Sequence, residues 1–403
     1  MGWLTAAEAL TVLGVRAQTL YANVSRRRIR AKPDPGNPRR SLYHEADVRK
    51  LAGRRAGARR TERVAAGAME WGDPILPSAI STVAQGRLWY RGRDAVGLAE
   101  TLTLEEVSGV LWEDEGAPNA RGFQTTREGR SARSRSNASV PKQALPAMFT
   151  AMADRAGRDP PSHGRSAAVL RGEALEVLGT LAASIVDAEG VALHAQLATT
   201  WRRGRATDVL RRALVLLADH ELNASTFAVR VTVSTGASLT SGVLAGLATL
   251  SGPLHGRAAA GVIDLIRTGR QQDMRSAVRA GLAYGRVLSG FGHPLYPDGD
   301  VRAEALLRSF VVPPEYQELR TAVEELAGER PNIDFALAAM AACFRLPPDA
   351  PLVLFALARS VGWLAHAMEQ AAAGHLIRPR ARYVGPPIGA VTPMPVSRLS
   401  RPG

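Results

Sequence analysis

Apolar residues recur at helical spacing over most of the chain that follows Pro141. These stretches are apolar with polar interruptions and do not alternate residue by residue, which is typical of packed helices rather than of half-buried strands. No repeat of fixed period and no heptad is present. The pattern therefore predicts a mostly α protein. The predicted helices cover residues 143–156, 167–185, 191–201, 206–217, 225–231 and 239–250, and a further helix runs from 258 to 266.

Two short segments before these helices have the composition of strands. Residues 79–83 and 86–94 contain β-branched and aromatic residues and flank a turn, so they predict a pair of short strands. A helix is expected from Leu104 to Trp112, with Thr103 as its N-terminal cap. Residues 114–140 are rich in Ser, Arg, Gly and Asn and predict a mobile loop that carries no chemistry.

The first 60 residues have a different pattern. Apolar residues at helical spacing predict a helix over residues 4–13 and a second over 16–24, joined by a tight turn at Gly14. The basic and Pro/Gly/Asn-rich residues that follow predict a wing. Residues 4–51 resemble the winged helix-turn-helix of the MerR and excisionase type, whose second helix enters a groove of DNA. The candidate DNA-binding residues are Arg16, Gln18, Thr19, Arg26, Arg27, Arg28, Arg39 and Arg40. A basic helical cap that contacts another protein is the alternative interpretation.

The distribution of charge favours a polyanionic partner for this segment. The whole chain has a net charge of +14, and residues 1–60 contain fourteen Lys/Arg and four Asp/Glu, a local net charge of +10. The remainder of the chain is therefore close to neutral. A basic appendage on a nearly neutral body is typical of a protein that binds a polyanion such as DNA.

Cysteine content and hydropathy indicate the compartment. The single cysteine, Cys343, excludes an internal disulfide and a thiolate zinc site. No uninterrupted apolar run reaches transmembrane length, and the N-terminus lacks a basic region followed by an apolar signal core. We therefore expect a cytoplasmic protein that has no membrane association and no metal.

Three glycine- or proline-rich breaks interrupt the apolar pattern, and each contains a histidine or an aspartate. The breaks are residues 251–256 with His255, 290–296 with His293, and 330–335 with Asp334. A helix that begins at residue 258 puts His255 at its N-terminus, where the partial positive charge of the helix disfavours the imidazolium form. A neutral His255 suits donation to a carbonyl oxygen, although a histidine of a surface turn explains this hexapeptide equally well.

These three segments, in this order, resemble the three active-site segments of the citrate synthase family. Further matches lie at residues 219–226, 358–366 and 377–380, and the similarity runs from about residue 75 to 386. The resemblance implies the citrate-synthase fold, in which a smaller helical domain is inserted into a large helical domain. The domains expected for this chain are the winged helix-turn-helix at 1–60, a linker at 61–73, the large domain at 74–257 with 346–403, and the small domain at 258–345.

The resemblance also implies a reaction, the condensation of acetyl-CoA with oxaloacetate followed by hydrolysis to citrate and CoA. Asp334 would remove a methyl proton, His255 would stabilise the enol oxygen, and His293 would donate to the oxaloacetate carbonyl. The residues that would bind oxaloacetate are His220, Arg302, Arg359 and Arg378. Arg378 matches the arginine that in this family enters the partner subunit's site, so a homodimer with shared active sites is implied. Acetyl-CoA would be a co-substrate, and no permanently bound cofactor is implied.

Alternatives remain open at this point. Histidines that follow glycine often satisfy backbone carbonyls, and Asp334 could merely cap the helix after it. Arg359 is harder to explain in this way, because a guanidinium buried without an anion is costly. The reaction could instead use propionyl-CoA, as in 2-methylcitrate synthases. A DNA-binding regulator whose body senses an acyl-CoA or a dicarboxylate is the alternative from another class.

Overall fold

A computed structural model describes most of the chain in two compact units, Met1–Pro77 and Ser78–Gly403. Each unit contains a hydrophobic core of its own. The described residues are 2–13, 20, 24, 29–34, 37–49, 76–113, 123, 144–186, 192–253, 255–283, 288–379 and 383–385, without the side chains of 37–40.

The first unit contains a three-stranded antiparallel sheet and a helix, α1 (Ala6–Leu13). The sheet order is β1-β3-β2, with strands β1 (Trp3–Leu4), β2 (Ala31–Asp34) and β3 (Asn37–His44). β2 and β3 form a hairpin in the region that the sequence assigned to a wing. The core of the unit consists of Ala9, Leu13, Leu20, Ile29, Tyr43 and Val48.

The first predicted helix begins two residues later than expected. Trp3 and Leu4 pair with His44 and Tyr43 of β3, so the backbone there is extended and α1 starts only at Ala6. Of the second predicted helix, 16–24, only Leu20 and Val24 are described, and both have helical backbone. The rest of that helix, and with it the proposed helix-turn-helix, lies outside the described residues.

The second unit begins with a three-stranded antiparallel sheet. Its strands are β4 (Ser81–Ala84), β5 (Arg87–Tyr90) and β6 (Arg93–Asp94), in that order across the sheet. The predicted strand at 86–94 is divided in two because Arg91 and Gly92 form a second tight turn. Both residues have positive φ, 48° and 76°, as the two central residues of a type I′ hairpin require.

Helices form the remainder of this unit, and the predicted helices between residues 143 and 250 are confirmed with ends within three residues. The predicted Thr103 cap is also confirmed, since Thr103 and Glu106 form a capping box. The helix expected from residue 258 continues to Gln271. The helices are α4 (Ala95–Thr101), α5 (Leu104–Trp112), α7 (Ala144–Ala156), α8 (Ala167–Ala183), α9 (Leu193–Thr200), α10 (Thr207–Leu217), α11 (Ala224–Ser234), α12 (Leu239–Leu250), α13 (Ala258–Gln271), α14 (Met274–Ala283), α15 (Val301–Leu307), α16 (Pro314–Ala327), α17 (Ile333–Phe344) and α18 (Ala350–Ala373).

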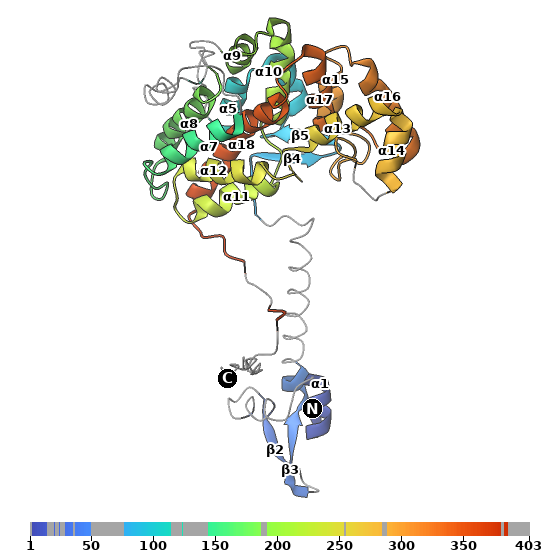
Figure 1. Ribbon diagram of the computed structural model, residues 1–403. Coiled ribbons are helices and arrows are strands. Elements are labelled where there is room, and N and C mark those ends of the chain that lie inside the picture. The colour runs from blue at the N-terminus through green and yellow to red at the C-terminus, as the bar shows by residue number, and fades with distance from the viewer. Residues whose placement is uncertain are drawn as a thin grey trace, which may run out of the picture. The chain divides into compact units, whose positions relative to one another are not determined.

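Two hydrophobic clusters divide the helices of this unit. The smaller cluster is drawn from residues between Ala259 and Ala339, and the larger cluster takes in most of the other helices. In Figure 1 the helices α13 to α17 accordingly gather at one side of the unit, in yellow and orange. Because α15 and α17 also contribute to the larger cluster, these two helices join the two parts.

Helix α18 is the central helix of the larger cluster and packs against α10, α11 and α12. Its length and hydropathy match those of a membrane span, but 89% of the apolar window is buried against the other helices. Burial of that kind is expected for the core helix of a globular domain. Gly362 of α18 allows the turn after α10 to approach closely, and its N–H donates to the carbonyl oxygen of Ala218 at 3.1 Å.

Candidate active site

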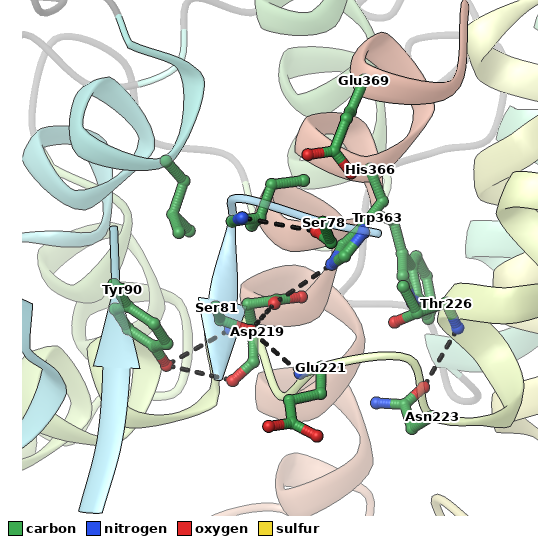
Figure 2. Close-up of polar contacts among 12 residues, drawn as sticks. Ser78, Ser81, Tyr90, Asp219, Glu221, Asn223, Thr226, Trp363, His366 and Glu369 are labelled. Carbon is green, nitrogen blue, oxygen red and sulfur yellow. Dashed lines mark hydrogen bonds and ion pairs between the residues drawn. The ribbon is translucent and has the colours of Figure 1, made fainter. Parts of the chain in front are cut away.

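The turn after α10 places Asp219 and His220 in the interior of the second unit. Oδ2 of Asp219 accepts a hydrogen bond from the hydroxyl of Ser81 and lies 3.2 Å from Nε2 of His366 (Figure 2). The hydroxyl of Tyr90 lies 3.2 Å from the carbonyl oxygen of Asp219 and 3.3 Å from its backbone nitrogen. Two strands and α18 therefore hold the turn that carries His220.

His220 and His293 lie against one another with their ring centroids 5.1 Å apart. Nε2 of His220 is 3.0 Å from the hydroxyl of Tyr296. Nδ1 of His293 accepts a hydrogen bond from the backbone N–H of Leu295 at 3.2 Å, so neutral His293 carries its proton on Nε2. Burial, together with the charge of Arg302, lowers the pKa of His293 to about 4 and that of His220 well below the ordinary range.

His255 lies in the turn between α12 and α13, two residues before the N-cap of α13. Its backbone N–H donates to Gly252 at 3.1 Å, and that of Gly256 donates to Leu250 at 3.0 Å. A Cβ at position 256 would lie 2.5 Å from the carbonyl oxygen of Leu250, which explains the glycine there. The turn is thus closed onto the end of α12, with the His255 side chain left to point into the interior.

The side chain of His255 is neutral, as the sequence predicted. Burial, with a further contribution from the charge of Arg359, lowers the pKa of His255 to about 4. The main cause is therefore burial and not the helix terminus on which the prediction relied. Nε2 of His255 lies 2.9 Å from Oγ of Ser225, a residue in the first turn of α11.

Arg302 lies in the first turn of α15 and is held by Asp300, the N-cap of the same helix. Nε and Nη2 of Arg302 donate to the two carboxylate oxygens of Asp300 at 2.9 and 2.8 Å. Oδ2 of Asp300 also accepts the backbone N–H of Ile333 at 3.0 Å, which ties α15 to the start of α17. Burial alone would raise the pKa of Asp300, but the charge of Arg302 lowers it below its ordinary value.

Arg359 is buried on α18, and no described residue places a carboxylate in an ion pair with it. Its side chain is 1% exposed, Nε donates to the carbonyl oxygen of Leu217 at 2.9 Å, and Nη2 has no hydrogen-bond partner. The guanidinium lies over the ring of Phe355, 4.7 Å from its centroid. Burial lowers the pKa of Arg359 to about 10, which still leaves it charged near pH 7.

Asp334 is the second residue of α17, and it is not the cap of that helix. Asn332 is the N-cap, and its side-chain oxygen accepts the backbone N–H of Asp334 at 3.0 Å. No hydrogen bond or ion pair to the carboxylate of Asp334 is made by the described residues. Burial raises the pKa of Asp334 to about 6, although the charges of Arg302 and Arg359 act in the opposite direction.

The structure brings six of the seven predicted catalytic and substrate residues together. The charges of Arg302 and Arg359 lower the pKa of His220, and His293 and His255 are near enough to lower it as well. The same two arginines also act to lower the pKa of Asp334. The ring of Phe355 contacts the guanidinium of Arg359, and its centroid is 6.0 Å from that of the His255 ring. The six residues are His220, His255, His293, Arg302, Asp334 and Arg359.

The seventh residue, Arg378, is not part of this group within the chain. It is exposed in the segment after α18 and makes no hydrogen bond or ion pair with a described residue of the site. Nearby backbone contacts hold this segment against the unit, since Ile377 donates to Ser234 at 3.1 Å. For the first unit, the candidates Arg16, Gln18, Thr19, Arg26, Arg27 and Arg28 lie outside the described residues, and Arg39 and Arg40 are in β3 without described side chains.

Sequence reasoning missed residues that hold the site together. Ser225, Tyr296 and Asp300 each contact a predicted site residue, yet none was singled out. Asp300 had a local signal, since an aspartate just before a helix is a common N-cap. The contact between Ser225 and His255 joins residues 30 positions apart and had no local signal.

Possible metal ligands and the cavity near the site bear on its chemistry. No group of three or more His, Cys, Asp or Glu side chains among them is arranged to hold a metal ion. A cavity of about 680 Å³ lies between α7, α13 and the start of α18, and it is lined by none of the six site residues. The candidate site is therefore a constellation of imidazole, guanidinium and carboxylate groups in which His220, Arg302 and Arg359 are buried and the other three residues are partly buried.

Comparison with protein families identifies the second unit. Residues 69–380 match the family model described as the citrate synthase C-terminal domain. The chain belongs to the citrate synthase family. The match includes every residue of the constellation described above, from His220 to Arg359, and also Arg378.

Relatives with similar sequences match different shares of this chain. Citrate synthase 2 of Bacillus subtilis is 37% identical over 190 residues, which are 44% of this chain and 51% of the relative. The chain thus spans about half the length of that relative. A 2-methylcitrate synthase of Mycobacterium tuberculosis is 29% identical over 346 residues, 76% of this chain and 88% of the relative.

A solved structure has a similar fold, and nearly the whole of that structure matches part of this chain. It is the citrate synthase of the archaeon Thermoplasma acidophilum in a ternary complex with carboxymethyl coenzyme A and oxaloacetate. The TM-score is 0.66 and the identity 26%, with 80% of this chain and 96% of the other covered. The citrate-synthase fold expected from the sequence is therefore confirmed for the second unit.

Proposed function

We propose that this chain condenses acetyl-CoA with oxaloacetate and hydrolyses the product to citrate and CoA. The observation that carries the proposal is that Asp334 and Arg359 belong to one site, and that neither forms an ion pair with a described residue. A carboxylate kept free and held near neutral pKa can accept a proton from carbon. A buried cation kept free is stabilised only when an anionic ligand arrives.

In this proposal the chemistry begins at Asp334. Its carboxylate removes a proton from the acetyl methyl group, and the electron pair of the C–H bond moves toward the thioester oxygen. His255 donates a hydrogen bond to that oxygen from Nδ1, the nitrogen that does not contact Ser225, and this requires the Ser225 hydroxyl to turn from Asn223 and donate to Nε2. The enolate carbon then bonds to the ketone carbon of oxaloacetate, and the ketone oxygen takes a proton from Nε2 of His293. The proton held by Asp334 is returned to His293 through solvent, which restores both groups. Water displaces the CoA thiol from the resulting thioester.

The two carboxylates of oxaloacetate would be bound by the cations of the site. Arg302 and Arg359 lie next to His220 and His293, so a dicarboxylate there would bring its ketone oxygen to His293. Arg378 of the partner subunit would complete the set, which requires a homodimer with shared sites. The exposed position of Arg378 after α18 supports that role.

A thiol-release assay tests the activity directly. Protein, oxaloacetate and acetyl-CoA should release free CoA at a rate that depends on both substrates. Propionyl-CoA forms the second arm, because a relative of this chain is a 2-methylcitrate synthase. Faster release from propionyl-CoA would favour that second candidate, and no release with either thioester would contradict the proposed condensation.

We propose a large domain at residues 74–257 and 346–403 and a small domain at 258–345. The separate hydrophobic cluster of residues 259–339 supports this division. Movement of the small domain would close the site over oxaloacetate and exclude water from the condensation. A cytoplasmic location is proposed as well, since the only cysteine, Cys343, is a free thiol.

We propose DNA binding as a second function, carried by a winged helix-turn-helix at residues 1–60 with a linker at 61–73. A basic segment with its own core, a helix and a β-hairpin favours DNA binding over a simple basic tail.

Full-length protein should bind duplex DNA with an affinity that falls steeply with salt, and a chain that begins at residue 78 should not. The substitutions Arg39→Ala and Arg40→Ala should weaken binding, whereas Arg49→Ala, whose side chain pairs with Glu45 at 2.9 Å, should not. Equal binding by the shortened chain would contradict the proposal. If DNA binding changes with oxaloacetate or acyl-CoA while no thiol is released, the chain is a ligand-sensing regulator instead.

A further inference from the structure

Tyr296 contacts three of the residues that the proposed function assigns to oxaloacetate. Its hydroxyl is 3.0 Å from Nε2 of His220, and its ring centroid is 5.1 Å from that of His293. The guanidinium carbon of Arg302 lies 5.2 Å from the centroid of the same ring. Because Tyr296 is only 3% exposed, these contacts are made in the interior, where they are strong and geometrically restrictive.

The pair formed by Tyr296 and His220 has one proton more than its hydrogen bond requires. Burial raises the pKa of Tyr296 to about 12, and burial with the charges of Arg302 and Arg359 keeps His220 neutral by lowering its pKa. A phenol and a neutral imidazole carry one donor hydrogen each. Their mutual bond uses one of these hydrogens, so the other remains available to a ligand.

The surrounding charges decide which hydrogen is left over. The phenol has no described acceptor other than Nε2 of His220, and Nδ1 of His220 has no described partner. Arg302 and Arg359 act on His220 from nearby, so an anion is the ligand that suits this space. An N–H that faces an anion is favourable, whereas a nitrogen lone pair in the same place is repelled.

We propose that Tyr296 is a positioning residue that donates to Nε2 of His220 and thereby holds Nδ1–H toward a carboxylate of the substrate. Its ring at the same time packs against the guanidinium of Arg302, which is also held by hydrogen bonds to Asp300. This inference rests on the proposed function, because the anion is taken to be oxaloacetate. It explains why a phenol is buried among charged and imidazole groups rather than in an apolar core.

Tyr296→Phe tests the hydroxyl alone, because it keeps the ring. We expect the KM for oxaloacetate to rise about tenfold with kcat changed less than twofold, since one hydrogen bond to a charged ligand is weakened. Tyr296→Leu removes the ring as well and should raise KM further. Tyr316→Phe is the matched control, because Tyr316 is equally buried but packs its ring against Phe335 in the smaller cluster. Its KM should equal that of the unchanged protein.

A second readout measures the tautomer directly and needs no activity. The chain has eight histidines, so ¹⁵N-histidine spectra of the full-length protein are tractable, with His220→Gln to assign the signal. His220 should show the Nδ1–H tautomer in the unchanged protein and in Tyr316→Phe, and it should lose that preference in Tyr296→Phe. A His220 that carries its proton on Nε2, or a Tyr296→Phe variant with unchanged tautomer and KM, would overturn the inference. If no thioester is turned over, the proposed function fails, and the tautomer still tests Tyr296 separately.

Discussion

Nε2 of His255 lies 2.9 Å from Oγ of Ser225, and Nε1 of Trp363 donates to the same hydroxyl at 3.3 Å. Ser225 Oγ is also 2.7 Å from the side-chain oxygen of Asn223. The hydroxyl is therefore held from three directions, and it restricts His255 to an orientation in which Nδ1 is the nitrogen left for a ligand. In the proposed mechanism, Ser225 is therefore a positioning residue for His255.

Replacement of Ser225 by alanine should lower kcat by about tenfold, because His255 loses the partner that orients its ring. The KM for oxaloacetate should change little, since Ser225 contacts none of the arginines. Steady-state kinetics of thiol release measure both constants. Ser360→Ala is the control, because Ser360 is equally buried and its hydroxyl donates to Ala356 at 2.7 Å within α18. Similar losses in the two variants would indicate a packing effect only.

Asp334→Asn should abolish most of the reaction while oxaloacetate still binds. The amide keeps the shape of the carboxylate but cannot accept the methyl proton, and loss of a general base commonly costs about 10²–10⁴ in rate. Deuterium exchange from solvent into the methyl group of acetyl-CoA, with a non-reacting oxaloacetate analogue bound, isolates this step. Exchange that persists unchanged in the variant would show that another group is the base.

Stability should depend on pH through the same carboxylate. Burial raises the pKa of Asp334 to about 6 from an ordinary value near 3.8, so the folded state holds more protons than the unfolded state between these values. Stability contributed by this group is therefore present at low pH and is lost as the pH rises through about 6. Above that pH the ionised group should cost roughly 3 kcal/mol, which Asp334→Asn removes. Urea unfolding should show the variant to be more stable at pH 7.5, with the difference disappearing near pH 4, and an opposite sign would contradict the assignment.

Arg359→Leu should make the ligand-free protein more stable and unable to bind oxaloacetate. Arg359 is 1% exposed and its Nη2 has no hydrogen-bond partner among the described residues, so an apolar side chain removes the cost of a buried charge. Arg230→Leu is the matched control, because Arg230 is as buried but pairs with Glu369 at 2.5 Å and Gln370 at 3.0 Å. Its loss should destabilise the fold by about 3 kcal/mol. Thermal unfolding and calorimetric titration with oxaloacetate measure the two effects, and destabilisation by both variants would mean that Arg359 is structural.

Hybrid dimers test whether Arg378 acts across subunits. Arg378→Ala and Asp334→Asn proteins should each be inactive, because one lacks the residue donated to the partner and the other lacks the base. Mixing and re-associating them should restore part of the activity, since each hybrid dimer contains one complete site. Activity that stays absent in verified hybrids, or an active monomer in sedimentation, would contradict shared sites.

The positions of most helices and of the three active-site breaks could be predicted from the sequence alone. Helix α12 runs from Leu239 to Leu250 as expected, and Thr103 caps α5 as expected, because helical periodicity and capping depend on residues only a few positions apart. The three breaks at His255, His293 and Asp334 were visible for the same reason, since glycine and proline act on the local backbone.

Local patterns were less informative where strands and tertiary contacts compete. Trp3 and Leu4 have helical spacing with the residues after them, but pairing with β3 makes them a strand. The strand predicted at 86–94 turns back at Arg91 and Gly92 because a second hairpin follows at once. In both places the conformation of the backbone is decided by pairing with another strand.

The chain by itself therefore determined its elements and the types of residue in the candidate site, and the tertiary structure decided how those residues are paired. Arg302 is paired with Asp300, whereas Arg359, which is equally buried, has no carboxylate partner among the described residues. Ser225 and Tyr296 meet His255 and His220 only after residues 30 and 76 positions apart are packed together. Hydrogen bonds over such separations depend on how helices pack, and no short window of sequence contains that information.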